Sequence, residues 1–144
     1  MPALNQTVPT SIATPPSKRL LVVEDECLIA LMMADHLIEL GYTVVGPAFT
    51  ISEALHLARV GSIDAALLDL NLHGVFAGEV ADILSRRQIP FLFISGYDQP
   101  PTSCYQTIDV LHKPFVLNAL RHAVECMLAK LSGEIHPSVE QTCV

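Results

Sequence analysis

Short apolar runs alternate with amphipathic segments through the middle of the chain. The apolar runs have the length of buried strands, and they cover residues 19–23, 42–45, 63–68, 90–94 and 108–111. The segments that follow four of them have helical periodicity, and they cover residues 27–40, 50–60, 77–87 and 115–131. Strands that alternate with helices form βαβ units with right-handed crossovers. We therefore predict an α/β fold with a doubly wound, five-stranded parallel sheet and helices on both faces.

One connection departs from this alternation, and both ends of the chain lack it. Residues 97–107 contain two adjacent prolines and no apolar helical period, so we expect the fourth crossover helix to be shortened or replaced by a loop. Residues 1–17 hold four prolines among polar residues, and the apolar period also fails over residues 132–144. We therefore expect a disordered polar N-terminal tail, a single domain over residues 18–131 and a polar C-terminal tail.

Two local signals mark the ends of predicted helices. Gly41 directly follows the first helical segment, where a glycine commonly stops a helix. Thr50 and Glu53 have the spacing of a capping box, in which each side chain accepts a hydrogen bond from a free backbone N–H at the helix start. These signals predict a first helix that ends near residue 40 and a second that begins near residue 51.

Composition and charge limit the classes of function. A chain of 144 residues with 51% hydrophobic content makes one domain with a packed core. The net charge is −7 at pH 7 with 8 Lys and Arg residues, which leaves no basic surface for nucleic acid, and no apolar run is long enough to span a bilayer. The N-terminus lacks the basic start and apolar segment of a signal peptide. We expect a cytoplasmic protein with neither nucleic-acid nor membrane partners.

The four cysteines form no C-x-x-C pair and have no spacing typical of zinc sites; they are Cys27, Cys104, Cys126 and Cys143. We interpret them as free thiols. Cys27 and Cys126 fall on helical patterns, so we expect both to be small buried hydrophobic residues.

The strand over residues 63–68 is followed at once by a carboxylate, Asp69, and then by turn-forming residues. Other predicted strands also end at polar side chains, namely Glu24 and Asp25, Ser95, and Lys113. Because parallel strands place their carboxyl ends at one edge of the sheet, where ligands bind in open α/β folds, these groups can converge. The sequence thus predicts a site at that edge.

The chemistry of this set suits phosphoryl transfer. Glu24, Asp25 and Asp69 would repel one another, and a hard cation with oxygen ligands such as Mg²⁺ is the natural neutraliser. Asp69 can attack phosphorus and form an acyl phosphate. Lys113 and the metal would offset charge on the phosphoryl oxygens, and the Ser95 hydroxyl can donate a hydrogen bond to one of them.

Each residue taken alone also has an ordinary structural explanation. Asp69 could be a turn aspartate, Glu26 an acid favoured at a helix start, and Lys113 a solvated surface charge. His73 lies in the loop after Asp69, where solvent exposure is the ordinary state, although a histidine there could compete for metal. The combination of Asp69 with Asp25 and Lys113 favours the functional interpretation.

Four motifs, in order and at suitable intervals, resemble those of the receiver domain of two-component response regulators. They cover residues 20–26, 67–69, 93–96 and 111–115, and the resemblance extends over residues 18–131. It implies a flavodoxin-like (βα)₅ fold and transfer of a phosphoryl group from a histidine kinase or histidine phosphotransfer protein to Asp69.

The resemblance also implies a ligand set and a backbone feature. Mg²⁺ would bind Asp25, Asp69 and the backbone carbonyl of Asn71, with Glu24 helping through water. The Lys113-Pro114 bond would be cis, as is usual in this family.

Two features depart from the family pattern. Val110 stands where many receivers have an aromatic switch residue, so the usual coupling of a hydroxyl swing to an aromatic rotation cannot run through it. Residues 93–97 and the polar loop after them are similar to those of stand-alone receivers from alphaproteobacteria, which pair with a distinct kinase class.

Three functional hypotheses follow. The first is a single-domain receiver, since too few residues follow the last helix for an effector domain; it would act by binding an unknown downstream protein or by draining phosphate from a kinase. Such a domain is not an enzyme beyond its own phosphorylation and dephosphorylation. The second is a pseudo-receiver that binds partners without phosphorylation. The third is an aspartate-nucleophile phosphohydrolase, which would need a second aspartate where Asn71 stands.

Overall fold

A computed structural model describes residues 16–96 and 107–131 of the chain. Five parallel strands form the central sheet in the order β2-β1-β3-β6-β7, and these strands are β1 (Arg19–Val23), β2 (Thr43–Ala48), β3 (Ala65–Asp69), β6 (Phe91–Ser95) and β7 (Val110–His112). The helices of the described residues are α1 (Cys27–Glu39), α2 (Ile51–Val60), α3 (Gly78–Arg86) and α4 (Leu117–Leu131). The predicted α/β fold with a flavodoxin-like parallel sheet is confirmed.

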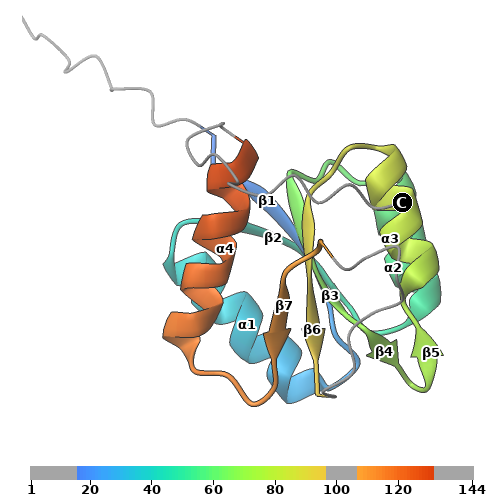
Figure 1. The fold of residues 1–144 in the computed structure, drawn as a ribbon, viewed down its shortest axis with the longest axis horizontal. Helices are drawn as coiled ribbons and strands as arrows, with labels where there is room; N and C mark the ends of the chain where they lie inside the picture. The colour runs from blue at the N-terminus through green and yellow to red at the C-terminus, as the bar shows by residue number, and fades with distance from the viewer. Residues whose placement is uncertain (1–15, 97–106, 132–144) are drawn as a thin grey trace, which may run out of the picture.

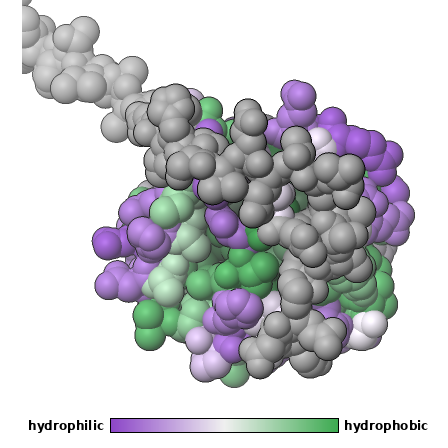
Figure 2. Space-filling view, viewed as in Figure 1, coloured by the Kyte–Doolittle hydropathy of each residue, from purple (hydrophilic) through white to green (hydrophobic). Residues whose placement is uncertain are grey.

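Helices cover both faces of this sheet. Figure 1 shows α1 and α4 on one side of the strands and α2 and α3 on the other. Figure 2, drawn from the same direction, shows polar side chains on both outer flanks with hydrophobic surface between them. The expected loss of a helix between β6 and β7 falls on residues 97–107, of which only residue 107 is described. The expected N-terminal tail, apart from residues 16 and 17, and the whole expected C-terminal tail lie outside the described residues.

Two apolar cores lie on opposite faces of the sheet because successive strand residues point to opposite sides. In β1, Leu20 and Val22 join the core under α1 and α4, while Leu21 and Val23 join the core under α2 and α3. All five residues of β3 are buried, as expected of a central strand covered on both faces. This burial holds the end of β3, and therefore Asp69, in a fixed place.

The predicted helix ends are confirmed, with one difference in detail. Gly41 follows α1 with φ +97°, a left-handed conformation that favours glycine. Thr50 Oγ1 accepts a hydrogen bond from the Glu53 backbone N–H at 3.2 Å. Glu53 Oε2 accepts from the N–H of Phe49 rather than from that of Thr50, at 3.2 Å, so the reciprocal bond reaches one residue further back than predicted.

Three local expectations were wrong, and a fourth, the burial of Cys126, holds only in part because that residue is half-buried. Cys27 is exposed because it is the first residue of α1 and lies one turn before the buried residues of that helix begin at Ala30. Strand β2 continues beyond residue 45 to Ala48, past a cis Gly46-Pro47 bond. The segment after Asp69, expected to be a loop, contains the hairpin of β4 (Asn71–Leu72) and β5 (Val75–Phe76).

We predict that Gly46→Ala destabilises the fold by about 2–3 kcal/mol. Gly46 has φ +93°, and a Cβ there would lie 2.7 Å from the backbone nitrogen of Ala48. Gly41→Ala is a matched control, because Gly41 has φ +97° and a Cβ there would meet nothing within 4 Å. Gly41→Ala should lower the free energy of unfolding by only about 1 kcal/mol, which is the cost of placing an alanine in the left-handed region. Urea unfolding measures both, and equal losses would contradict a close-contact role for Gly46.

Candidate functional site

Four strand ends bring the predicted residues to one edge of the sheet. Glu24 and Asp25 follow β1, and the Glu24 backbone N–H donates to the Ala48 carbonyl at the end of β2, at 3.0 Å. Asp69 is the last residue of β3. Lys113 follows β7, and its backbone N–H donates to the carbonyl of Ser95, the last residue of β6, at 2.8 Å. The sheet therefore fixes the backbone of each candidate residue.

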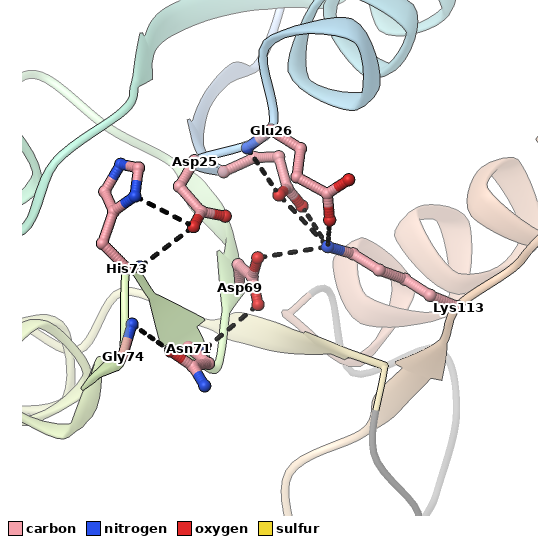
Figure 3. Close-up of polar contacts among 8 residues, drawn as sticks. Asp25, Glu26, Asp69, Asn71, His73, Gly74 and Lys113 are labelled. Atoms are coloured by element: carbon pink, nitrogen blue, oxygen red, sulfur yellow. Dashed lines mark hydrogen bonds and ion pairs between the residues drawn. The ribbon is translucent and has the colours of Figure 1, made fainter.

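Lys113 is the centre of the charged contacts. Its Nζ lies 3.1 Å from Asp69 Oδ2, and 3.1 and 2.9 Å from the two carboxylate oxygens of Glu24. Figure 3 shows the lysine side chain extending between the ends of β1 and β3, where Glu26 Oε1 also lies 3.4 Å from Nζ. One cation is thus shared by three carboxylates from two strand ends.

A hairpin closes the opposite side of the site. The backbone N–H of His73 donates to Asp25 Oδ2 at 2.9 Å, and the ring Nδ1 lies 3.6 Å from the same oxygen. The Asn71 backbone N–H donates to Asp69 Oδ1 at 3.1 Å, while the Asn71 side-chain oxygen accepts from the Gly74 N–H at 2.7 Å. These bonds tie the residues after Asp69 to two of the candidate carboxylates (Figure 3).

Burial and charge shift the acid–base properties of the site. Burial raises the pKa of Glu24 to about 7, and the hydrogen bond from Lys113 offsets only part of that effect. Burial alone would lower the pKa of Lys113, but hydrogen bonds to and charges on Glu24 and Asp69 outweigh it and raise that pKa above its usual value. Burial likewise acts to raise the pKa of Asp25, but hydrogen bonds, led by that from the His73 N–H, hold it below the usual value.

Glu24, Asp25 and Asp69, here called the acidic cluster, have the donor set of a cation site. Each offers a carboxylate oxygen within 4.8 Å of the others. Glu24 and Asp69 are buried, so their charges are poorly screened by water. Hard divalent cations prefer such oxygen ligands, and the acidic cluster therefore fits Mg²⁺.

The cluster borders an open cavity of about 440 Å³. Asp25, Asp69 and Lys113 line it, together with Asn71 from the hairpin. Ser95 is buried at the end of β6 and is not among the described lining residues, whereas the next residue, Gly96, is. Of the predicted site residues, Ser95 and Glu24 are thus the two that do not line the cavity, although Glu24 contacts Lys113, which does.

Sequence reasoning missed two contacts. Glu26 was interpreted as an acid at a helix start, yet it lies against Lys113. His73 is exposed as expected, with 65% of its side-chain surface accessible, yet it also contacts Asp25. The contact of Glu26 could have been predicted, because Glu26 is adjacent in sequence to Glu24 and Asp25. The contact of His73 could not, because it depends on the hairpin of β4 and β5.

Comparison with known proteins decides the family. A family model of the response regulator receiver domain matches residues 20–125. The chain belongs to the response regulator receiver family. Receivers of this family bind Mg²⁺ at an acidic pocket and are signalling domains of two-component systems rather than metabolic enzymes. They interact with kinases or phosphotransfer proteins and with downstream targets.

Two solved structures and one curated protein are similar to this chain, which is consistent with its assignment to the receiver family. SdrG from Sphingomonas melonis Fr1 is 40% identical with a TM-score of 0.70, covering 79% of this chain and 98% of that one. PhyR from Brucella abortus is 28% identical with a TM-score of 0.70, covering 82% and 50%. The transcriptional regulatory protein PdtaR of Mycobacterium tuberculosis is 29% identical in an alignment 131 residues long that covers 82% of this chain. This receiver spans 63% of the length of that curated relative.

Two further findings complete the description. The Lys113-Pro114 bond is cis, as the family resemblance implied. Among the described residues, no helix of the receiver is both long and apolar enough to cross a membrane.

Proposed function

We propose that this receiver accepts a phosphoryl group on Asp69 from a phosphohistidine donor, in a reaction that depends on Mg²⁺. The observation that carries the proposal is the position of Asp69, which lines an open cavity while its Oδ2 lies 3.1 Å from Lys113 Nζ. A carboxylate that is held by a buried strand and faces a cation is placed to act as a nucleophile. Mg²⁺, bound by the acidic cluster and the Asn71 carbonyl, would offset charge on the phosphoryl oxygens.

Each side chain has a part in the transfer. A carboxylate oxygen of Asp69 forms the new P–O bond, and the P–N bond to the donor imidazole breaks with its electron pair remaining on that nitrogen. Lys113 faces Asp69 and would neutralise one phosphoryl oxygen. Ser95, at the end of the neighbouring strand, would donate a hydrogen bond to another. Glu24 holds Lys113 in place and adds negative charge that attracts the cation.

The phosphorylated receiver would then act by contact with another protein or as a sink for phosphoryl groups. A signalling role requires that phosphorylation change the population of two surface conformations, whereas a sink needs only turnover. The intact set of Asp25, Asp69 and Lys113 supports phosphorylation rather than a pseudo-receiver. The phosphohydrolase alternative lacks support because Asn71, which occupies the position of the required second acid, binds the hairpin through its side chain.

The test identifies by chemical labelling which residue carries the phosphoryl group. The full chain is incubated with acetyl phosphate, with and without Mg²⁺, reduced with borohydride to convert an aspartyl phosphate to homoserine, and mapped by peptide mass spectrometry. We expect homoserine at residue 69 only when Mg²⁺ is present. Homoserine at another aspartate, or none at all with Mg²⁺ bound, would overturn the proposal.

The raised pKa of Glu24 predicts that Mg²⁺ binds more tightly as the pH rises from 6 to 8. With a pKa of about 7, Glu24 is mostly protonated and neutral at pH 6 and mostly charged at pH 8, so the acidic cluster gains negative charge over this interval. Calorimetric titration with Mg²⁺ should show affinity that rises severalfold and then levels off. Glu24→Gln should remove most of the pH dependence, and a wild-type affinity that does not vary between pH 6 and 8 would contradict the prediction.

A further inference from the structure

Glu26 stands directly before α1, but its side chain does not cap that helix. It occupies the N-cap position, where a side chain usually accepts a hydrogen bond from a free N–H of the first turn, and it accepts none. Its Oε1 instead lies 3.4 Å from Lys113 Nζ (Figure 3). The Glu26 backbone N–H donates to Glu24 Oε1 at 3.1 Å, which fixes the point where this side chain begins. The carboxylate is therefore directed to the site and not to the helix.

Lys113 has two closer carboxylate partners than Glu26. Its Nζ lies 2.9 Å from Glu24 Oε2 and 3.1 Å from Asp69 Oδ2, and both of these partners are buried. The Glu26 side chain is 62% exposed. In formal charges, Lys113 and one Mg²⁺ would balance the three carboxylates of the acidic cluster. Glu26 therefore adds a negative charge beyond that balance, at the solvent-exposed side of the site.

Glu26 lies where two cavities adjoin. It lines the open cavity that Asp69 and Lys113 also line. With Lys113 it further lines a second cavity of about 460 Å³, whose other walls include Met32 and Phe115. Phosphoryl transfer is in line, so the leaving atom of a donor lies on the side of phosphorus away from Asp69, within the cavity that Glu26 borders. The Glu26 carboxylate thus faces the space that a leaving group occupies.

We propose that Glu26 is a specificity-determining residue that favours donors with a nitrogen leaving group over acyl phosphates. The inference rests on the proposed function and deepens it by assigning donor selectivity to a residue. In both reactions a carboxylate oxygen of Asp69 forms the new P–O bond. A nitrogen donor reacts with its leaving nitrogen protonated, and the electron pair of the broken P–N bond neutralises that nitrogen. In an acyl phosphate, the pair of the broken P–O bond leaves on a carboxylate.

The two leaving groups therefore differ in charge in the transition state. The nitrogen still carries part of its positive charge, whereas the acyl oxygen already carries part of a negative charge. The Glu26 carboxylate attracts the first and repels the second. Because Glu26 is exposed, water and salt screen this interaction, and we expect an effect of about three- to tenfold on relative rates.

The experiment compares labelling of Asp69 in the full chain by phosphoramidate and by acetyl phosphate, at pH 7 with saturating Mg²⁺ and constant ionic strength. Both donors deliver the same phosphoryl group, so the ratio of their second-order rate constants isolates the effect of the leaving group. Intact mass follows each reaction. Glu26→Gln should lower the ratio of the phosphoramidate to the acetyl phosphate rate constant by about three- to tenfold. Glu26→Asp keeps the charge and should keep a ratio close to that of wild type.

Glu39→Gln is the matched control, because it makes the same change in net charge at the other end of α1. Its side chain is 78% exposed, and thirteen helical residues place it about 20 Å from Glu26. The ratio should stay at the wild-type value in this variant. A second control is salt: at 1 M the screening length falls to about 3 Å, so the difference between wild type and Glu26→Gln should shrink.

The outcomes separate this inference from the proposed function. An unchanged ratio in Glu26→Gln, including an equal change in both rates, would overturn the inference, because Glu26 would then act only by holding Lys113. A change as large in Glu26→Asp or Glu39→Gln would overturn it as well, since the effect would not depend on a charge at this position. Failure of the proposed function would instead appear as wild-type protein that neither donor labels at Asp69.

Discussion

Asp69→Asn should reduce phosphoryl incorporation from acetyl phosphate to background. The amide has nearly the shape of the carboxylate but lacks a nucleophilic oxygen, and Asp69 is almost fully buried, with 5% of its surface exposed, so a surrogate residue cannot take its place without rearrangement. The Asn71 N–H can still donate to the remaining side-chain oxygen, which favours an intact fold. Intact mass after incubation with acetyl phosphate and Mg²⁺ measures the loss.

The control for this variant is Asp35→Asn, which makes the same chemical change at an exposed position on α1. It should incorporate phosphoryl groups as wild type does. A second measurement checks that Asp69→Asn is folded. Asp69 contributes to raising the pKa of Glu24, so removing its charge should lower that pKa in a folded variant. Carboxyl-carbon NMR of a folded Asp69→Asn protein should show that decrease. Incorporation at the wild-type level in Asp69→Asn would show that the phosphoryl group resides elsewhere.

The parts of the fold that the sequence predicted are those set by periodicity. Buried strands and amphipathic helices each repeat over enough residues to be recognised, and parallel topology then brings Asp25, Asp69 and Lys113 to one edge. The structure confirms this convergence, with Lys113 Nζ within 3.1 Å of Asp69. Such agreement is possible because the positions of these residues follow from where strands end, not from side-chain detail.

The parts that the sequence did not predict depend on short elements and on side-chain geometry. Strands β4 and β5 have two residues each, too few to show a period, although a glycine that follows His73 between apolar residues was a usable hairpin signal. The contact of His73 with Asp25 exists only because that hairpin forms. The burial expected for Cys27 was wrong because helical periodicity does not reveal whether another element covers the first turn of α1, where Cys27 is exposed.

Leu67→Ala should lower the free energy of unfolding by about 3–5 kcal/mol. Leu67 has no exposed surface and lies at the middle of β3, the central strand. Its backbone partners are Val22 on one side and Leu92 on the other, and its side chain belongs to the core under α1 and α4. Because hydrogen-bonded strands flank it on both sides, the backbone cannot move in to fill the cavity that a smaller side chain leaves.

Urea unfolding of the full chain measures this loss against Leu28→Ala, which makes the same substitution on the surface. The Leu28 side chain is 83% exposed in the first turn of α1, so its truncation should change stability by less than about 0.5 kcal/mol. A loss below about 1 kcal/mol for Leu67→Ala would mean that the core around β3 relaxes easily. The same strand ends at Asp69, so an easily relaxed core would also remove the argument that β3 holds this carboxylate rigidly against Lys113.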